Sequence, residues 1–285
     1  QAPHPYDAEV VPDKQPVRRS KQMTFLKPKN FLRSLNWFGC VIYEYFTTPY
    51  RHDYSYIPPW YYLLDRVKRK LRNLRGVNDL YDKFEPTKED FAYFPLHYEP
   101  EVSLLLLAPH ATDQINVIKQ IARSLPVTYK LYVKEHPLMV IFRPRSYYKE
   151  LKKIPNVKLI NPAIPSLDVI PHAKLITTIT GSAGWEGLLF KKPVVALGDQ
   201  FYNVISMVKR CHDYVQLAYI IKEQLEKFQY NEEELLQYIA CAFEDTAELP
   251  LSYIWELETD ENKKRQGLAP LADLLAKKMG LTQKN

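Results

Sequence analysis

The sequence predicts an α/β fold: a Rossmann-like, doubly wound parallel sheet, preceded by an aromatic, basic and mainly helical N-terminal segment. Short β-branched or aromatic runs alternate with helical patterns through residues 89–248. Four of the eight glycines fall within residues 181–198: three lie between two of the apolar runs, and the fourth follows the second run. The basic excess lies in residues 1–75, which hold fourteen Lys and Arg against six Asp and Glu. The chain therefore divides into segments 1–88, 89–248 and 249–285.

Composition narrows the class of protein. Of the 285 residues, 46% are hydrophobic and 25% are charged, which is typical of a globular protein. The sequence has neither an apolar run of about twenty residues nor a signal-peptide pattern at its start. Its three cysteines are scattered, without a metal-ligand spacing. We expect a cytoplasmic protein with free cysteines.

The N-terminal segment 1–88 has three parts. Residues 1–30 are rich in Pro and Lys and predict an extended arm. Residues 31–64 are rich in aromatics and predict short helices, broken at Pro49 and at the proline pair 58–59. Residues 60–75 predict a helix with a cationic face, and Gly76 is its expected C-cap.

Two interpretations of this segment stay open. A basic helix beside aromatic side chains suits an anionic membrane surface, which would place the protein at the inner face of the membrane. The aromatics also suit a cap that completes a core. Nucleic acid is not an expected partner, because the segment has no aromatic-interleaved RNA motif and no reading helix.

Segment 89–248 alternates strands and helices. The predicted strands share β-branched or aromatic content and cover residues 91–97, 129–136, 156–160, 174–180 and 193–197. The predicted helices start near residues 113, 146, 166, 184 and 213, and the last runs to residue 228. Asn231 and Glu234 form a capping box for another helix, and the tail 249–285 has a helical pattern.

The first candidate site is the motif at residues 133–137, at the end of the second predicted strand. In open α/β sheets the carboxyl ends of the strands face the ligand crevice. Lys134 and His136 suit phosphate oxygens there, and a histidine also transfers protons. A strand-end histidine beside a surface lysine is the simpler alternative.

The second candidate site follows the fourth predicted strand. Its phosphate-binding candidates share small size or polarity and are Thr180, Gly181, Ser182, Ala183, Gly184 and Glu186. A glycine turn that opens a helix presents N–H groups to an anion, and an acid in the first turn suits sugar hydroxyls. The stretch matches neither a dinucleotide fingerprint nor a P-loop, and a plain glycine turn is the alternative. Because both sites lie at one edge of one sheet, they suggest a nucleotide or nucleotide-sugar.

Five stretches, all in order between about residues 90 and 205, resemble the capsule polysaccharide biosynthesis family, which includes Kdo transferases and is similar to two-domain GT-B glycosyltransferases. They are residues 94–101, 113–114, 131–137, 180–186, and 192–198 with 201–202. The resemblance implies that segment 89–248 is the C-terminal, donor-binding half of a GT-B enzyme. It also implies that Lys134 and His136 hold the donor phosphate, supported by Ser182 and the neighbouring amides, and that Glu186 meets the ribose.

The sequence departs from that family pattern at its start. A GT-B enzyme has a first Rossmann-like domain, whereas only about 90 residues precede the donor half here, so that domain is reduced or lies outside this chain. Candidate acid/base or acceptor residues are therefore His97, Glu99 and Glu101, after the first predicted strand. The alternatives are that His97 packs under the sheet and that the two acids are solvated loop residues.

The expected activity is glycosyl transfer from a nucleotide-sugar, such as a CMP-Kdo-like or UDP-sugar donor, to a glycan or lipid-linked acceptor. We expect no cofactor, and no obligatory metal because no Asp-x-Asp motif lies between the strands. Two alternatives remain: a CDP-alditol phosphotransferase of the teichoic-acid type, and a non-catalytic nucleotide-sugar-binding module.

Overall fold

The computed structural model describes residues 28–49, 57–137, 139–256 and 258–281. Most of the predicted extended arm, residues 1–27, lies outside this part of the chain. The chain forms two compact units. Among the described residues, one unit ends at residue 230, and the other covers residues 231–256 and 258–281.

The larger unit contains one six-stranded sheet in which all neighbouring strands are parallel. The strands are β1 Phe91–Pro95, β2 Lys130–Lys134, β3 Val157–Ile160, β4 Leu175–Thr178, β5 Val194–Ala196 and β6 Val208–Arg210. Their spatial order is β3-β2-β1-β4-β5-β6, which is the Rossmann order. The predicted fold class is confirmed. The order of the strands reverses between β1 and β4, where such sheets bind ligands.

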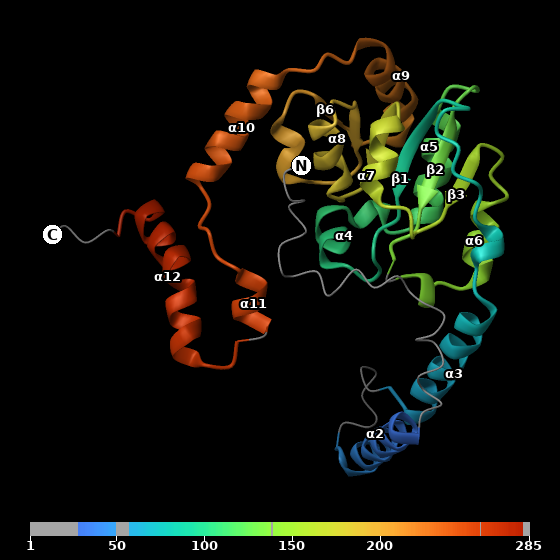
Figure 1. Ribbon diagram of the computed structural model, residues 1–285, viewed down its shortest axis with the longest axis vertical. Coiled ribbons are helices and arrows are strands. Elements are labelled where there is room, and N and C mark those ends of the chain that lie inside the picture. The colour runs from blue at the N-terminus through green and yellow to red at the C-terminus, as the bar shows by residue number, and fades with distance from the viewer. Residues whose placement is uncertain (1–27, 50–56, 138, 257, 282–285) are drawn as a thin grey trace. The chain divides into compact units, whose positions relative to one another are not determined.

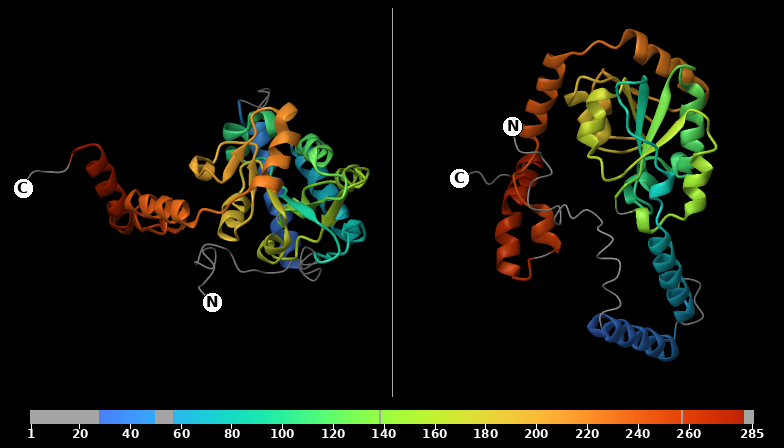
Figure 2. Two further views of the ribbon diagram at one scale, coloured as in Figure 1. Left: turned by 90° about the horizontal axis from the view of Figure 1, so that it is seen from above. Right: turned by 45° about the vertical axis from the view of Figure 1, so that its right-hand side comes forward.

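Helices cover both faces of the sheet (Figures 1 and 2). Apolar side chains of α5 (Gln114–Ser124), α6 (Arg145–Leu151) and α9 (Leu217–Lys227) form a core with one face of β1 and β2. Helices α7 (Ser166–Val169) and α8 (Ala183–Leu189) lie on the other face. Both faces are therefore buried, which explains why the strands are continuous apolar runs rather than alternating ones.

Two helix N-caps predicted from the sequence are present in the structure. The Asp113 carboxylate accepts the Asn116 N–H at 3.1 Å at the start of α5. The Asn231 side chain accepts the Glu234 N–H at 3.1 Å at the start of α10 (Glu232–Glu244). A side-chain acceptor satisfies one of the N–H groups that a helix start leaves without a partner.

One α-helix and one strand in the described part of the larger unit were not predicted. Helix α4 (Val102–Leu107) follows the loop after β1, and its run of four leucines has one buried member, Leu104. Strand β6 has three residues, of which Val208 is buried and Lys209 is exposed. A short, charged edge strand lacks the apolar run by which the inner strands are recognised.

Two helices precede the sheet, α2 (Pro28–Thr47) and α3 (Pro59–Arg75). Helix α2 begins inside the predicted extended arm, because Pro28 is compatible with a first helical turn. Helix α3 ends as predicted at Gly76, whose φ is 63° and whose N–H donates to the Arg72 carbonyl. The helices meet through an edge-on contact of Trp37 with Tyr62, at 6.1 Å between ring centroids.

The described part of the second unit is helical. It consists of α10, α11 (Leu251–Glu256) and α12 (Glu261–Lys278). Helix α11 packs on α12 at Gly267, where a Cβ would lie 2.7 Å from the Ile254 Cδ1 atom. Among the described residues, no helix combines the length and apolarity that crossing a bilayer requires.

Candidate functional site

The residues predicted to form the two phosphate loops and the acid/base group all follow carboxyl ends of strands. Lys134 ends β2, His97 follows β1, and the segment from Thr180 to Glu186 follows β4. Because β2, β1 and β4 are adjacent and parallel, their following loops lie at one edge of the sheet. The edge includes the β1–β4 switch point.

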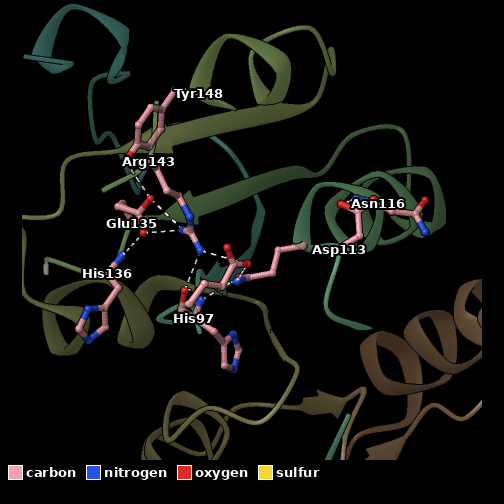
Figure 3. A network of polar contacts seen from close by, with 9 residues as sticks. His97, Asp113, Asn116, Glu135, His136, Arg143 and Tyr148 are labelled. Atoms are coloured by element: carbon pink, nitrogen blue, oxygen red, sulfur yellow. Dashed lines mark hydrogen bonds and ion pairs between the residues drawn. The ribbon is translucent and has the colours of Figure 1, made fainter. Parts of the chain in front are cut away.

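A buried ion pair anchors this edge (Figure 3). Arg143 Nη1 donates to both carboxylate oxygens of Glu135, at 2.7 and 2.9 Å. The Tyr148 hydroxyl donates to the same carboxylate at 2.9 Å, and the His136 N–H donates to it at 2.7 Å. Burial raises the pKa of Glu135, while Arg143 and these donors oppose the shift. Four hydrogen bonds compensate the buried carboxylate for lost water.

The same guanidinium reaches the loop after β1. Arg143 Nη2 donates to the His97 carbonyl at 2.8 Å and lies 3.3 Å from the Glu99 carboxylate. The Gln114 side chain accepts the His97 N–H at 2.8 Å and donates to the Glu99 carboxylate. The positions of His97 and Glu99 are therefore fixed by α5 and by the segment after β2.

The His97 imidazole faces the loop after β4. Its Nε2 accepts the Thr180 N–H at 3.0 Å, so in the neutral ring the proton is on Nδ1. Burial, with the charges of Arg143 and His136, lowers the pKa of His97 from 6.5 to about 4. Nδ1 is buried and has no hydrogen-bond partner among the described residues. The ring is thus a neutral acceptor at physiological pH.

Side chains fix every backbone polar group of the pair Thr180–Gly181. The Thr180 N–H is bound by His97, and its carbonyl accepts from Gln200 Nε2 at 2.6 Å. The Gly181 N–H donates to Thr178 Oγ1 at 3.0 Å, and its carbonyl accepts from the Tyr202 hydroxyl at 2.6 Å. The loop is preorganised by groups from three different parts of the sheet edge.

The four clustered glycines allow close packing rather than a left-handed turn. None has a positive φ, so no left-handed turn requires them. Each is instead a site of close approach. A Cβ on Gly184 would lie 2.5 Å from the Tyr202 hydroxyl oxygen, and one on Gly187 would lie 2.8 Å from Ile176 Cγ1. Side chains at these positions would push α8 away from the sheet and from Tyr202.

Helix α8 begins at Ala183 and has only seven residues. Its dipole is consequently a weaker source of anion attraction than the sequence suggests, because few peptide units contribute to it. Ser182 precedes the helix, and its hydroxyl donates to Glu186 at 2.9 Å on the exposed side.

Lys134 is a buried cation at this edge, 7% exposed. Its ammonium group donates to the Ser166 hydroxyl at 3.0 Å. Burial lowers the pKa of Lys134 to about 8, and the negative charge of Glu186 opposes the shift. A buried ammonium group with a neutral partner retains strong affinity for an anion.

His136 lies beside the loop after β1. It is partly exposed, and its ring contacts Tyr98 edge-on at 5.9 Å between centroids. Burial lowers the pKa of His136, Glu101 opposes the shift, and the positive charges of Lys134 and Arg143 add to it. Glu101 is thereby placed close enough to His136 to interact with it electrostatically.

The sequence reasoning did not single out Arg143, Gln114 or Tyr202 as site residues. Two of these residues, Gln114 and Tyr202, belong to stretches that carry the family resemblance. That resemblance is the sequence signal that could have placed them at the site. The sequence gives no comparable signal for Arg143, because its partner Glu135 is eight residues away across a turn of the chain. Among the described residues, no group of three or more His, Cys, Asp or Glu is placed to hold a metal ion.

A cavity of about 580 Å³ lies elsewhere, at the amino end of the sheet. Its lining includes Lys119, Arg123 and Lys130, but Glu150 already pairs with Lys119 and Lys153. It shares no residue with the carboxyl edge.

Fold and site together define a Rossmann-type protein with a cationic, preorganised carboxyl edge. The profile of the family described as "Capsule polysaccharide biosynthesis protein" matches residues 38–236, more than half of the chain. The chain belongs to this family of capsule polysaccharide biosynthesis proteins.

Individual relatives are more distant. Protein FixF of Sinorhizobium fredii (strain NBRC 101917 / NGR234) is 30% identical over 136 residues, which are 46% of this chain and 32% of FixF. The chain thus matches about a third of the length of that relative.

Solved structures show weaker similarity. The β-Kdo 2,4 transferase of Thermosulfurimonas dismutans KpsC is 19% identical with a TM-score of 0.41, over 65% of this chain and 56% of that chain. The β-Kdo 2,7 transferase of the same KpsC is 19% identical with a TM-score of 0.37, over 58% and 52%. Scores at this level assign no activity.

Proposed function

We propose that this chain binds a nucleotide-activated sugar and takes part in transferring the sugar to a glycan or lipid-linked acceptor in capsule polysaccharide biosynthesis. One observation supports the proposal most strongly. The buried ammonium group of Lys134 lies at the switch-point edge and interacts electrostatically with Glu186, in the segment whose first residues, Thr180 and Gly181, are held by His97 and Thr178. A fixed cation beside exposed hydroxyl and carboxylate groups suits a nucleoside phosphate ester.

The donor-binding roles follow from the chemistry of the side chains. Lys134 and His136 bind the phosphate oxygens as charged or neutral donors. Ser182 and its neighbouring amides support the phosphate, whereas the N–H groups of Thr180 and Gly181 are already bound by His97 and Thr178. Glu186 accepts hydrogen bonds from the ribose hydroxyls, exchanging its present bond from Ser182 for them.

The transfer step requires a base and a stabilised leaving group. The acceptor hydroxyl oxygen forms a bond to the anomeric carbon while the bond from that carbon to the phosphate oxygen breaks. The nucleotide leaves with the electron pair, and the positive charge of Lys134 stabilises it. A carboxylate takes the acceptor proton. Orientation of the two substrates supplies the rest of the acceleration. The proposed step uses no cofactor and no metal.

We propose Glu101 as that base, with Glu99 in an orienting role. Glu99 is bound by Gln114 and by Arg143, so its carboxylate is already engaged. Glu101 is partly exposed and interacts electrostatically with His136, which we propose to bind the donor phosphate, and this supports its choice as the base. Replacing Glu101 with Gln is expected to abolish transfer and to leave nucleotide affinity within about threefold, because a base for the acceptor does not hold the donor.

A donor panel tests the activity. Purified chain is incubated with CMP-sugars, UDP-sugars and CDP-glycerol, together with membrane-derived glycolipid acceptors, and the released nucleotide is quantified. Turnover of a nucleotide-sugar supports the proposal. Turnover of CDP-glycerol alone replaces it with the phosphotransferase alternative. Binding without turnover, restored in a longer chain of the same protein, identifies this chain as a nucleotide-sugar-binding module.

We further propose that α2 and α3 dock on an anionic membrane surface at the cytoplasmic leaflet. Leu32, Leu35, Tyr43 and Phe46 of α2 are between 59% and 71% exposed. Lys68 and Lys70 of α3 are exposed as well. Apolar side chains near basic ones fit the boundary between lipid tails and anionic headgroups, and residues 1–75 carry the basic excess of the chain.

Vesicle sedimentation tests the docking. We expect binding to phosphatidylglycerol vesicles and little to phosphatidylcholine vesicles, because each basic side chain near the surface adds about 1 kcal/mol. Lys68→Glu with Lys70→Glu should release the protein. Lys222→Glu with Lys227→Glu, the same charge change on α9, should not. Equal effects of both pairs would overturn the proposal.

A further inference from the structure

His97 is connected to three loops of the site. Its backbone N–H and carbonyl are bound to the Gln114 side chain on α5, and the carbonyl also accepts from Arg143. Its ring accepts the Thr180 N–H in the loop after β4. One residue therefore joins the segments that follow β1, β2 and β4.

The ring is poorly placed for proton transfer to a substrate. The side chain belongs to a residue that is 6% exposed, and its Nε2 lone pair is occupied by the Thr180 N–H. Nδ1 is buried as well. An acid or base must come within hydrogen-bond reach of the proton that it moves, and neither ring nitrogen is open to solvent.

We propose that His97 is a positioning residue, whose neutral ring holds the Thr180–Gly181 backbone in the conformation that binds the donor nucleotide. The inference rests on the proposed function, because it takes this loop to be part of the nucleotide site. It changes the expected role of His97 from acid/base group to the residue that couples the donor loop to the Arg143–Glu135 ion pair.

The geometry around the loop supports a single conformation. Gly181 has no room for a side chain, since a Cβ there would lie 2.8 Å from Thr178 Oγ1 and 3.3 Å from His97 Nε2. Gln200 and Tyr202 bind the two carbonyls from the opposite side. If the His97 acceptor is lost, the Thr180 N–H is left buried without a partner. The loop can then lower its free energy by turning that N–H toward water.

Two amide substitutions separate this role from proton transfer. In His97→Gln, the side-chain oxygen reaches the position of Nε2 and can accept the Thr180 N–H. In His97→Asn, the shorter side chain places its oxygen at the position of Nδ1 and leaves that N–H unpaired. Both variants are uncharged and unable to act as a base, which makes them a matched pair.

The experiment measures nucleotide affinity by calorimetry and transfer kinetics for the wild type and both variants, with thermal unfolding as a check on folding. We expect His97→Gln to keep nucleotide affinity within about threefold and to retain kcat. We expect His97→Asn to weaken nucleotide binding about tenfold, as loss of one buried hydrogen bond does, and to raise KM for the donor more than it lowers kcat.

Three outcomes are informative. Loss of kcat in both variants at unchanged nucleotide affinity would overturn the proposal and make His97 an acid/base group. Equal affinity of His97→Asn and wild type would also overturn it. If the wild-type chain binds none of CMP, CDP, UDP or GDP, the proposed function itself is wrong. That result differs from the first two, which contradict only the role of His97. Should His97→Asn not fold, Thr178→Val removes the acceptor of the neighbouring Gly181 N–H and gives the same affinity readout.

Discussion

Arg143 and Glu135 form a buried ion pair whose two hydrogen bonds, at 2.7 and 2.9 Å, join the end of β2 to the segment that precedes α6. The pair lies beneath the candidate site, and Arg143 extends it to the carbonyl of His97. A charge pair in this position, together with the Tyr148 hydrogen bond to Glu135, fixes the separation of the two loops.

The first prediction concerns this pair. Arg143→Ala leaves the Glu135 carboxylate buried without its cation and should reduce the free energy of unfolding by about 3–5 kcal/mol. Urea denaturation at pH 7 measures the loss. The double variant Arg143→Met with Glu135→Leu removes both charges and should recover much of the stability. A loss below about 1 kcal/mol in the single variant would show that the pair is not buried in solution.

The second prediction concerns Gly184. In Gly184→Ala the new methyl group collides with the Tyr202 ring, so Tyr202 must move and its hydrogen bond to Gly181 is lost. We expect a loss of about 1–3 kcal/mol in unfolding free energy, as for other overpacked sites. Gly39→Ala is the control, because nothing lies within 4 Å of its Cβ and it is inside α2. The control should gain about 0.5–1 kcal/mol. The reverse order of the two melting temperatures would contradict the packing described here.

The third prediction concerns Lys134 and pH. Its folded pKa of about 8 lies below the ordinary 10.5, so between these values the unfolded chain binds more protons than the folded one. The free energy of unfolding should therefore rise with pH from about 8 to 10.5 through this group. At pH 7 the buried charge is a cost, and Lys134→Met should stabilise the ligand-free protein by about 1–3 kcal/mol.

The gain from Lys134→Met should shrink as the pH approaches 10.5, and the variant should bind nucleotide more weakly than the wild type. Thermal unfolding at pH 7 and pH 10 measures the first effect, and calorimetry measures the second. A variant that is less stable than the wild type at pH 7 would indicate that Lys134 is paired in solution.

The fold was largely predictable because its elements are local. The inner strands are apolar runs, and Asp113 and Asn231 mark helix starts by side-chain chemistry alone. Strand β6 was missed because three residues at a sheet edge, including exposed Lys209, carry no apolar period. Helix α2 was placed too late because a Pro- and Lys-rich stretch masked its first turn at Pro28.

The site was predictable only in part, for a physical reason. Parallel topology places strand ends together, so Lys134 and Thr180 could be assigned to one edge from the strand pattern. Arg143 could not, because its value to the site comes from contacts with residues 8 and 46 positions away. The packing partner of Gly184 could not be predicted for the same reason, since the group that excludes a side chain there is Tyr202, 18 positions away.

The central claim is that Lys134 and His136 hold the phosphate of a nucleotide at the switch-point edge. Titration calorimetry with CMP, CDP, UDP and GDP on the wild-type chain and on His136→Ala tests it most directly. We predict that at least one nucleotide binds the wild type, and that His136→Ala weakens that nucleotide by about 1.5–3 kcal/mol, as expected for one charged hydrogen bond. Identical affinities of the two proteins for every nucleotide, or no binding by the wild type, would contradict the claim.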